Sequence, residues 1–209
     1  FGKRQYKREI ILICGLSVFS HILTDLITSW GTQIFSPVSD YSVAWGLTFI
    51  IDPYFSGIIL VALIVALLKN SRITARAGLV ALTAYIGLQG VLKYQAHMIG
   101  QDYITQQAWN DASVYTMPQP LSPFNWKIVI ERDTQYHMAL VNLLANESAP
   151  IPDDDDTTIL NLARYYRPED QLDWVIFQGL TEDPQVATMW NRPEFELFRK
   201  FAVLPFSFE

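Results

Sequence analysis

The two residues best suited to chemistry are His21 and Asp25, which lie four positions apart in a long apolar stretch. On an α-helix, positions i and i+4 share one face about 6 Å apart along the axis, so both side chains can reach one ion or water molecule. Imidazole and carboxylate groups are common ligands of zinc and similar divalent metals. The spacing leaves a second interpretation open, in which the pair is a structural hydrogen bond between helices.

The elements that must position this pair are three apolar stretches, residues 10–24, 53–68 and 77–92, which contain no Asp, Glu, Lys or Arg. Each is slightly shorter than the roughly 20 residues needed to cross a bilayer, but its flanks can extend it. We therefore expect about three transmembrane helices rather than the buried helices of a soluble protein. An acid inside such a span is costly, which makes Asp25 a candidate functional residue.

Charge is divided unevenly along the 209 residues, whose formal net charge is −6. Residues 1–99 carry eight Lys/Arg and four Asp/Glu, whereas residues 100–209 carry seven and 17, so the two parts have net charges of +4 and −10. This asymmetry predicts a transmembrane helical domain over 1–99 and an acidic extramembrane domain over 100–209. The acidic balance argues against nucleic-acid binding, and one cysteine excludes a disulfide framework or a cysteine-based zinc site.

The basic residues of the first part indicate how the spans are oriented. They fall mainly into two groups, Lys3, Arg4, Lys7 and Arg8, followed by Lys69, Arg72 and Arg76. Because short basic segments stay in the cytoplasm, both groups are expected there. The loop 31–54 and the domain 100–209 are then periplasmic, in a multi-pass protein of the bacterial inner membrane.

The second part of the sequence predicts a small α+β domain. Residues 126–131 and 136–144 are expected to form a β-hairpin, and the proline-rich residues 115–123 an extended connector. Helices are expected over 157–166, over 168–180, from Asp183-Pro184 onward and over 193–201. His137 falls in the hairpin and is interpreted as structural or exposed, and His97 is expected to end the third span.

Residues 20–55 carry a more specific pattern. It consists of H-x-x-x-D at 21–25 with T-S-W-G-T-Q after it, P-V-S-D at 37–40 and F-I-I-D-P at 49–53. This pattern resembles a bacterial family of membrane-bound metal-dependent hydrolases, the YdjM-like proteins, which are described as LexA-binding inner-membrane-associated hydrolases. The P-L-S-P-F-N-W segment, residues 120–126, resembles the start of that family's extramembrane region.

The resemblance implies a divalent-metal site, with zinc the expected ion and His21 and Asp25 as ligands. It also implies that Asp52 is a ligand, a catalytic residue or a structural residue. Further His/Asp motifs of the family are absent from this sequence, so we expect additional ligands from a segment upstream of it. The chain is accordingly interpreted as a fragment of a longer protein.

The resulting functional hypothesis is an inner-membrane hydrolase that cleaves an ester or phosphoester, lipid-like substrates included, with metal-activated water. In this hypothesis Asp52 or Asp40 accepts a proton or orients a ligand histidine. The alternative is a non-catalytic membrane protein whose extramembrane domain binds a partner. Metal-dependent turnover that a chelator abolishes would separate the two.

Overall fold

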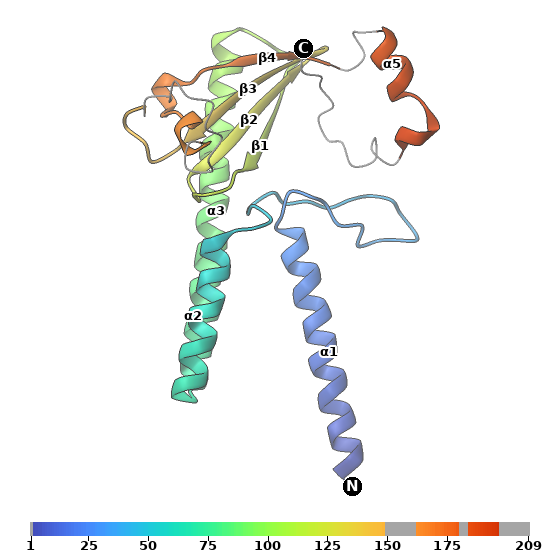
Figure 1. Cartoon of the computed structure of the whole chain (residues 1–209), viewed down its shortest axis with the longest axis vertical. Helices are drawn as coiled ribbons and strands as arrows, with labels where there is room; N and C mark the ends of the chain where they lie inside the picture. The colour runs from blue at the N-terminus through green and yellow to red at the C-terminus, as the bar shows by residue number, and fades with distance from the viewer. Residues whose placement is uncertain (1, 149–161, 180–183, 197–209) are drawn as a thin grey trace.

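The computed structural model describes residues 2–148, 162–179 and 184–196, and shows long helices beneath a small β-sheet domain (Figure 1). The helices are α1 (Gly2–Leu26), α2 (Pro53–Lys69) and α3 (Arg72–Gln106). By length and composition α1 and α3 can each cross a membrane, whereas α2 is a shorter apolar helix. The expected helical membrane region followed by an α+β domain is therefore present, with two full-length candidate spans in the described part of the chain.

The helices α2 and α3 form an antiparallel hairpin with well-defined ends. Asp52 caps the first turn of α2, and Pro53, the next residue, suits that position because its missing N–H would have no partner there. The helix ends at Asn70, which has a left-handed backbone with φ of 43°. The two helices approach closely where Gly78 faces Ala62, since any side chain at Gly78 would collide with Ala62.

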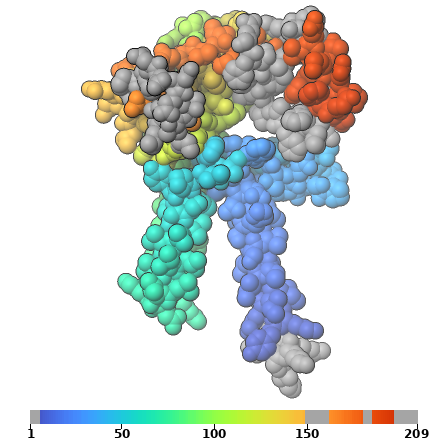
Figure 2. All heavy atoms as spheres, viewed as in Figure 1, coloured from blue at the N-terminus to red at the C-terminus, as the bar shows by residue number. Residues whose placement is uncertain are grey.

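The helix α1 stands apart from this hairpin. Figure 2 shows α1 and α2 as separate columns below the sheet domain, with open space between them. Most of the apolar side chains of α1 are exposed, as are many of α2 and of the N-terminal part of α3. Such outward-facing apolar surfaces suit helices surrounded by lipid.

The sheet is antiparallel and has the order β1-β2-β3-β4. Its strands are β1 (Ser113–Pro118), β2 (Asn125–Arg132), β3 (Gln135–Asn142) and β4 (Val175–Gln178). The predicted hairpin is confirmed, with Trp126 opposite Val141 and Arg132 opposite Gln135 across a two-residue turn. Asp133 in that turn has φ of 51°, as a tight hairpin requires.

The C-terminal part of α3 packs on β1 and β2 and thereby joins the membrane region to the sheet. The buried side chains of this core are Leu92, Ala96, Ile99 and Ile104 from α3 with Trp126, Ile128, Ile130 and Val141 from the sheet. At Gly100 a Cβ atom would lie 2.6 Å from Val114 Cγ1, so the missing side chain allows the helix to touch the strand. With 35 residues, α3 is about 50 Å long and exceeds the roughly 30 Å of a bilayer's hydrocarbon core.

Several sequence-based expectations for the second part of the chain were wrong. Of the helix expected over 168–180, the described residues 168–179 instead form a 3₁₀ turn, Glu169–Gln171, and strand β4, which pairs with β3. The connector expected over 115–123 begins as strand β1, paired with β2. The helix that contains the third apolar stretch continues beyond His97 to Gln106, and the end of the membrane span at His97 stays a prediction.

The remaining helix predictions have mixed outcomes. The helix expected from Asp183-Pro184 is confirmed as α5 (Pro184–Trp190). Of the helix expected over 157–166, the first half lies outside the described residues, and the second half contains a 3₁₀ turn, Ala163–Tyr165. The region 193–201 starts with another 3₁₀ turn, Pro193–Phe195, and its end lies outside the described residues.

Candidate metal-ligand pair at the end of α1

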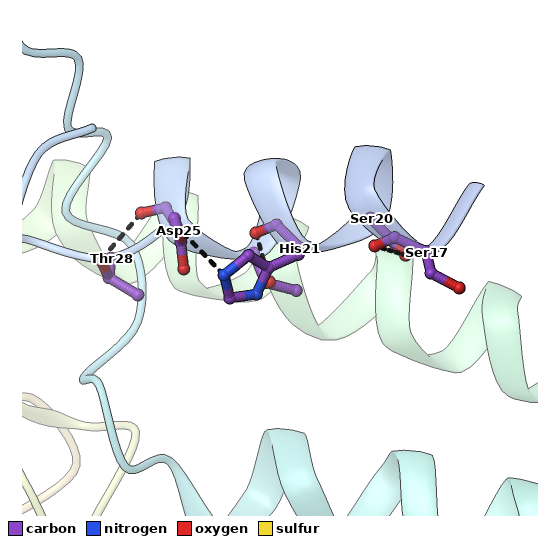
Figure 3. A network of polar contacts seen from close by, with 6 residues as sticks. Ser17, Ser20, His21, Asp25 and Thr28 are labelled. Atoms are coloured by element: carbon purple, nitrogen blue, oxygen red, sulfur yellow. Dashed lines mark hydrogen bonds and ion pairs between the residues drawn. The ribbon is translucent and has the colours of Figure 1, made fainter. Parts of the chain in front are cut away.

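The predicted pair forms on α1 as the helical spacing requires. His21 Nε2 lies 3.5 Å from Asp25 Oδ2, and the two side chains are 76% and 44% exposed. Figure 3 shows both side chains along the same side of the helix. The pair is therefore accessible to a ligand, because the structure does not bury it between helices.

Hydroxyl groups accompany the pair along the end of α1 and just beyond it, and form a polar stripe, which consists of Ser17, Ser20, His21, Thr24, Asp25 and Thr28. Figure 3 labels all of these residues except Thr24. Each hydroxyl is bonded to a main-chain carbonyl about one turn earlier, such as Thr24 to His21 O at 2.7 Å and Thr28 to Asp25 O at 2.8 Å. These bonds satisfy the hydroxyl groups locally. The ionisable groups of the stripe are the imidazole of His21 and the carboxylate of Asp25.

The loop after α1 fixes the helix end just beyond Asp25. The main-chain N–H of Trp45 donates to Leu26 O at 2.8 Å, and the N–H of Leu47 donates to Ile27 O at 2.8 Å. Lys93 of α3 donates to the carbonyl of Trp45 and so connects this loop to the α2–α3 hairpin. Asp25 thus directly precedes the point where the loop is bonded to α1 and α3, and His21 lies one helical turn earlier.

Asp52 is engaged elsewhere. Its Oδ1 accepts hydrogen bonds from the N–H groups of Tyr54 and Phe55, both at 2.9 Å, at the start of α2. Its Oδ2 accepts a hydrogen bond of 2.7 Å from the hydroxyl of Tyr85, which in turn accepts one of 2.9 Å from Gln89 Nε2. Asp52, Tyr85 and Gln89 are buried, so this carboxylate is a helix cap within an internal network that joins α2 to α3.

The other acid singled out, Asp40, is exposed, and the bond shown at this residue is accepted by its main-chain carbonyl from Gln33. Within residues 2–148, 162–179 and 184–196, no three His, Cys, Asp or Glu side chains gather closely enough to hold a metal ion. The donor types of His21 and Asp25 suit zinc, but a zinc site takes at least three protein ligands. Among the described residues, the pair therefore provides two of the three or more protein donors that a zinc site needs.

A cluster of aromatic side chains that the sequence did not predict lies where α3 meets the sheet. Tyr103 stacks on Trp174 with ring centroids 4.1 Å apart, and Trp109 lies edge-on to His137 at 4.8 Å. The side chain of His137 is buried, and its Nδ1 lies 3.3 Å from the Tyr103 hydroxyl. Burial lowers the pKa of His137, and the positive charge of Arg132 lowers that pKa further, which favours the neutral imidazole. The alternation of the hairpin predicted which residues share a face but not these partners, which come from distant segments.

The fold and the pair together define a membrane protein with a small sheet domain at one end of its helices. Residues 2–96 match the model of the YdjM inner membrane protein family, which supports a YdjM-like assignment for this region of the chain. The matched region contains α1, the loop after it, α2 and most of α3, and so includes His21, Asp25 and Asp52. Neither a curated protein nor a solved structure matches the chain.

Proposed function

We propose that this inner-membrane protein is a metal-dependent hydrolase in which His21 and Asp25 form one side of a divalent-metal site. The observation that carries the proposal is the exposed imidazole–carboxylate pair on one face of an apolar helix that is long enough to cross a membrane. A bound zinc ion would supply a hydroxide near neutral pH. Since the described residues provide two donors, the proposal requires further ligands from outside them, and the pair by itself does not complete a catalytic centre.

The position of the pair favours an ester or phosphoester at the membrane boundary as substrate. His21 and Asp25 lie in the last turns of α1, next to the loop that carries exposed Trp30, Phe35 and Trp45. Aromatic side chains of this kind favour the interface between lipid and water. A lipid-like substrate could therefore present its ester bond at the depth of the pair, with the loop and the sheet domain on the periplasmic side.

The proposal is tested by metal analysis of the protein purified in detergent, with His21→Ala and Asp25→Ala as test variants. Ser17→Ala is the matched control, because it lies on the same stripe one turn away and offers no strong zinc ligand. We expect each test variant to lose most of the bound metal and the control to retain it. Unchanged metal content in both test variants would reject the site.

The second candidate is a non-catalytic membrane protein whose sheet domain binds a partner. It is favoured by the lack of a third metal donor in the described part of the chain. It also draws support from a cavity of about 210 Å³ between α3 and the segment before β4, lined by Asp102, Glu169, Asp170, Tyr103 and Trp174 among others. Hydrolysis of a generic phosphoester that is abolished by a chelator would exclude this candidate, whereas metal-free protein without turnover would favour it.

A further inference from the structure

The hairpin of α2 and α3 has an apolar groove beside its closest contact. Ile59, Ala62, Leu63 and Ala66 of α2 and Ala75, Gly78, Leu79 and Leu82 of α3 line this groove, whose volume is about 260 Å³. The side chains at the contact are small, so the two backbones come close and leave a channel between the larger side chains on either side. All of these lining residues are apolar, so the groove suits a hydrocarbon chain.

Three basic residues stand at the tip of the hairpin, at one end of the groove. Lys69 follows Ala66 by one turn of α2, Arg72 precedes Ala75 by one turn of α3, and Arg76 precedes Leu79 by one turn. Residues three or four apart are neighbours on a helix surface, so each base borders a groove residue. Lys69, Arg72 and Arg76 are all exposed.

These bases have no acidic partner on the hairpin. The sequence contains no Asp or Glu between Asp52 and Asp102, and no ion pair involves any of the three bases within the part of the chain that the structure describes. The exposed cations at the tip are thus free to attract an anion.

The start of α3 at the tip also favours an anion. Two of the last carbonyls of α2 are satisfied there, because Asn70 N–H donates to Leu67 O and Ser71 N–H donates to Ala66 O, both at 3.2 Å. The first N–H groups of α3 point toward the same tip and carry the positive end of the helix dipole. Ser71 Oγ accepts from Thr74 N–H at 3.4 Å, which leaves the N–H groups of the first positions of α3 for an anion.

We propose that this hairpin binds one anionic phospholipid, with an acyl chain in the apolar groove and the phosphate between Lys69, Arg72 and Arg76. Charge complementarity selects this occupant over a second apolar helix, because a helix would fill the groove and leave the cations unmatched. Basic sites between transmembrane helices recognise anionic head groups in the same way. This lipid site lies on α2 and α3, so the proposal does not depend on the metal-ligand pair on α1.

The test is native mass spectrometry of the full chain in detergent with dioleoyl phosphatidylglycerol or, as head-group control, dioleoyl phosphatidylcholine. We expect one phosphatidylglycerol to remain bound and phosphatidylcholine to bind at least about fivefold more weakly. In R72Q/R76Q, phosphatidylglycerol affinity should fall at least about fivefold. In A75L, which fills the groove from an exposed position without changing charge, both lipids should bind more weakly.

The matched control is K7Q/R8Q, which removes two exposed positive charges from α1 and leaves the groove intact. We expect this variant to bind phosphatidylglycerol like the parent protein. An equal loss of binding in K7Q/R8Q and R72Q/R76Q would overturn the proposal in favour of general surface attraction. Equal binding of the two lipids by the parent protein would overturn it as well, and unchanged binding in A75L would exclude the groove. Circular dichroism establishes that each variant keeps its helical content.

Discussion

The membrane region and the sheet domain differ in how far their apolar side chains are exposed. In the sheet domain Trp126, Ile128 and Ile130 are completely buried, whereas in the membrane helices Leu60 and Leu67 are 57% and 71% exposed. The two regions meet on α3, which carries exposed apolar residues in its N-terminal part and packs against the sheet in its C-terminal part. The sheet domain is therefore stabilised by its own packing, whereas the exposed apolar side chains of the long helices suit an environment of lipid.

A matched pair of truncations should give the largest effect. Ile128→Ala removes a side chain that is 0% exposed, and should lower the free energy of unfolding by about 2–5 kcal/mol, because it leaves a cavity. Leu60→Ala truncates a lipid-facing side chain of α2 and should change it by no more than about 0.5 kcal/mol. Urea unfolding in detergent, followed by tryptophan fluorescence, measures both; similar losses would mean that the regions do not differ in this way.

Two glycines of α3, one in each region, should respond differently to substitution. Gly100→Val places methyl groups against Val114 and Ile128 and should destabilise the protein by about 1–3 kcal/mol through overpacking. Gly87→Ala meets no atom within 4 Å and should stabilise α3 by up to about 1 kcal/mol, since alanine favours helix. Thermal unfolding in detergent compares the two variants, and a destabilising Gly87→Ala would show that an unseen neighbour packs there.

The buried network at the start of α2 should give an intermediate effect. Asp52→Ala removes the cap and leaves the Tyr85 hydroxyl without its acceptor, at a cost of about 1–2 kcal/mol. Asp40→Ala, at an exposed position, is the control and should be neutral. Thermal unfolding again reports stability. If Asp52→Ala instead abolished hydrolysis with stability unchanged, Asp52 would be a catalytic residue and not a structural cap.

The smallest effect is a pH dependence confined to the sheet domain. The pKa of His137 is lower in the folded protein than the ordinary value of 6.5, so the unfolded chain binds this proton more readily. The stability that the neutral imidazole contributes is therefore complete above about pH 6.5 and is lost as the pH falls below that value. Thermal unfolding between pH 7.5 and 5.5 should show this loss, and His137→Gln should reduce the slope; an unchanged slope would assign the pH dependence to other groups.

The sequence predicted features that depend on local spacing. The uncharged stretches predicted the apolar helices, alternation predicted the β2–β3 hairpin, and the four-residue spacing predicted that His21 and Asp25 would meet. The cap at Asp52 is also local, because Asp-Pro before an apolar run is a helix-start signal. This signal could have identified its structural role.

Features that depend on distant partners were missed. The residues of β4 carry apolar spacing that also fits a helix, and pairing with β3 decides in favour of a strand. Strand β1 was missed because its region is rich in proline and was therefore interpreted as a connector. It lies at the edge of the sheet, where proline is tolerated. Tyr85 lies 33 residues from Asp52, and no local pattern connects them.

The continuity of α3 has a mechanical consequence. Because this one helix carries exposed apolar residues at its start and is packed into the sheet core at its end, the two parts cannot reorient independently. A thinner bilayer tilts long helices to keep their apolar length covered. Such a tilt would swing the whole sheet domain relative to the membrane plane, so the thickness of the surrounding lipid would set the angle at which the acidic domain faces its surroundings.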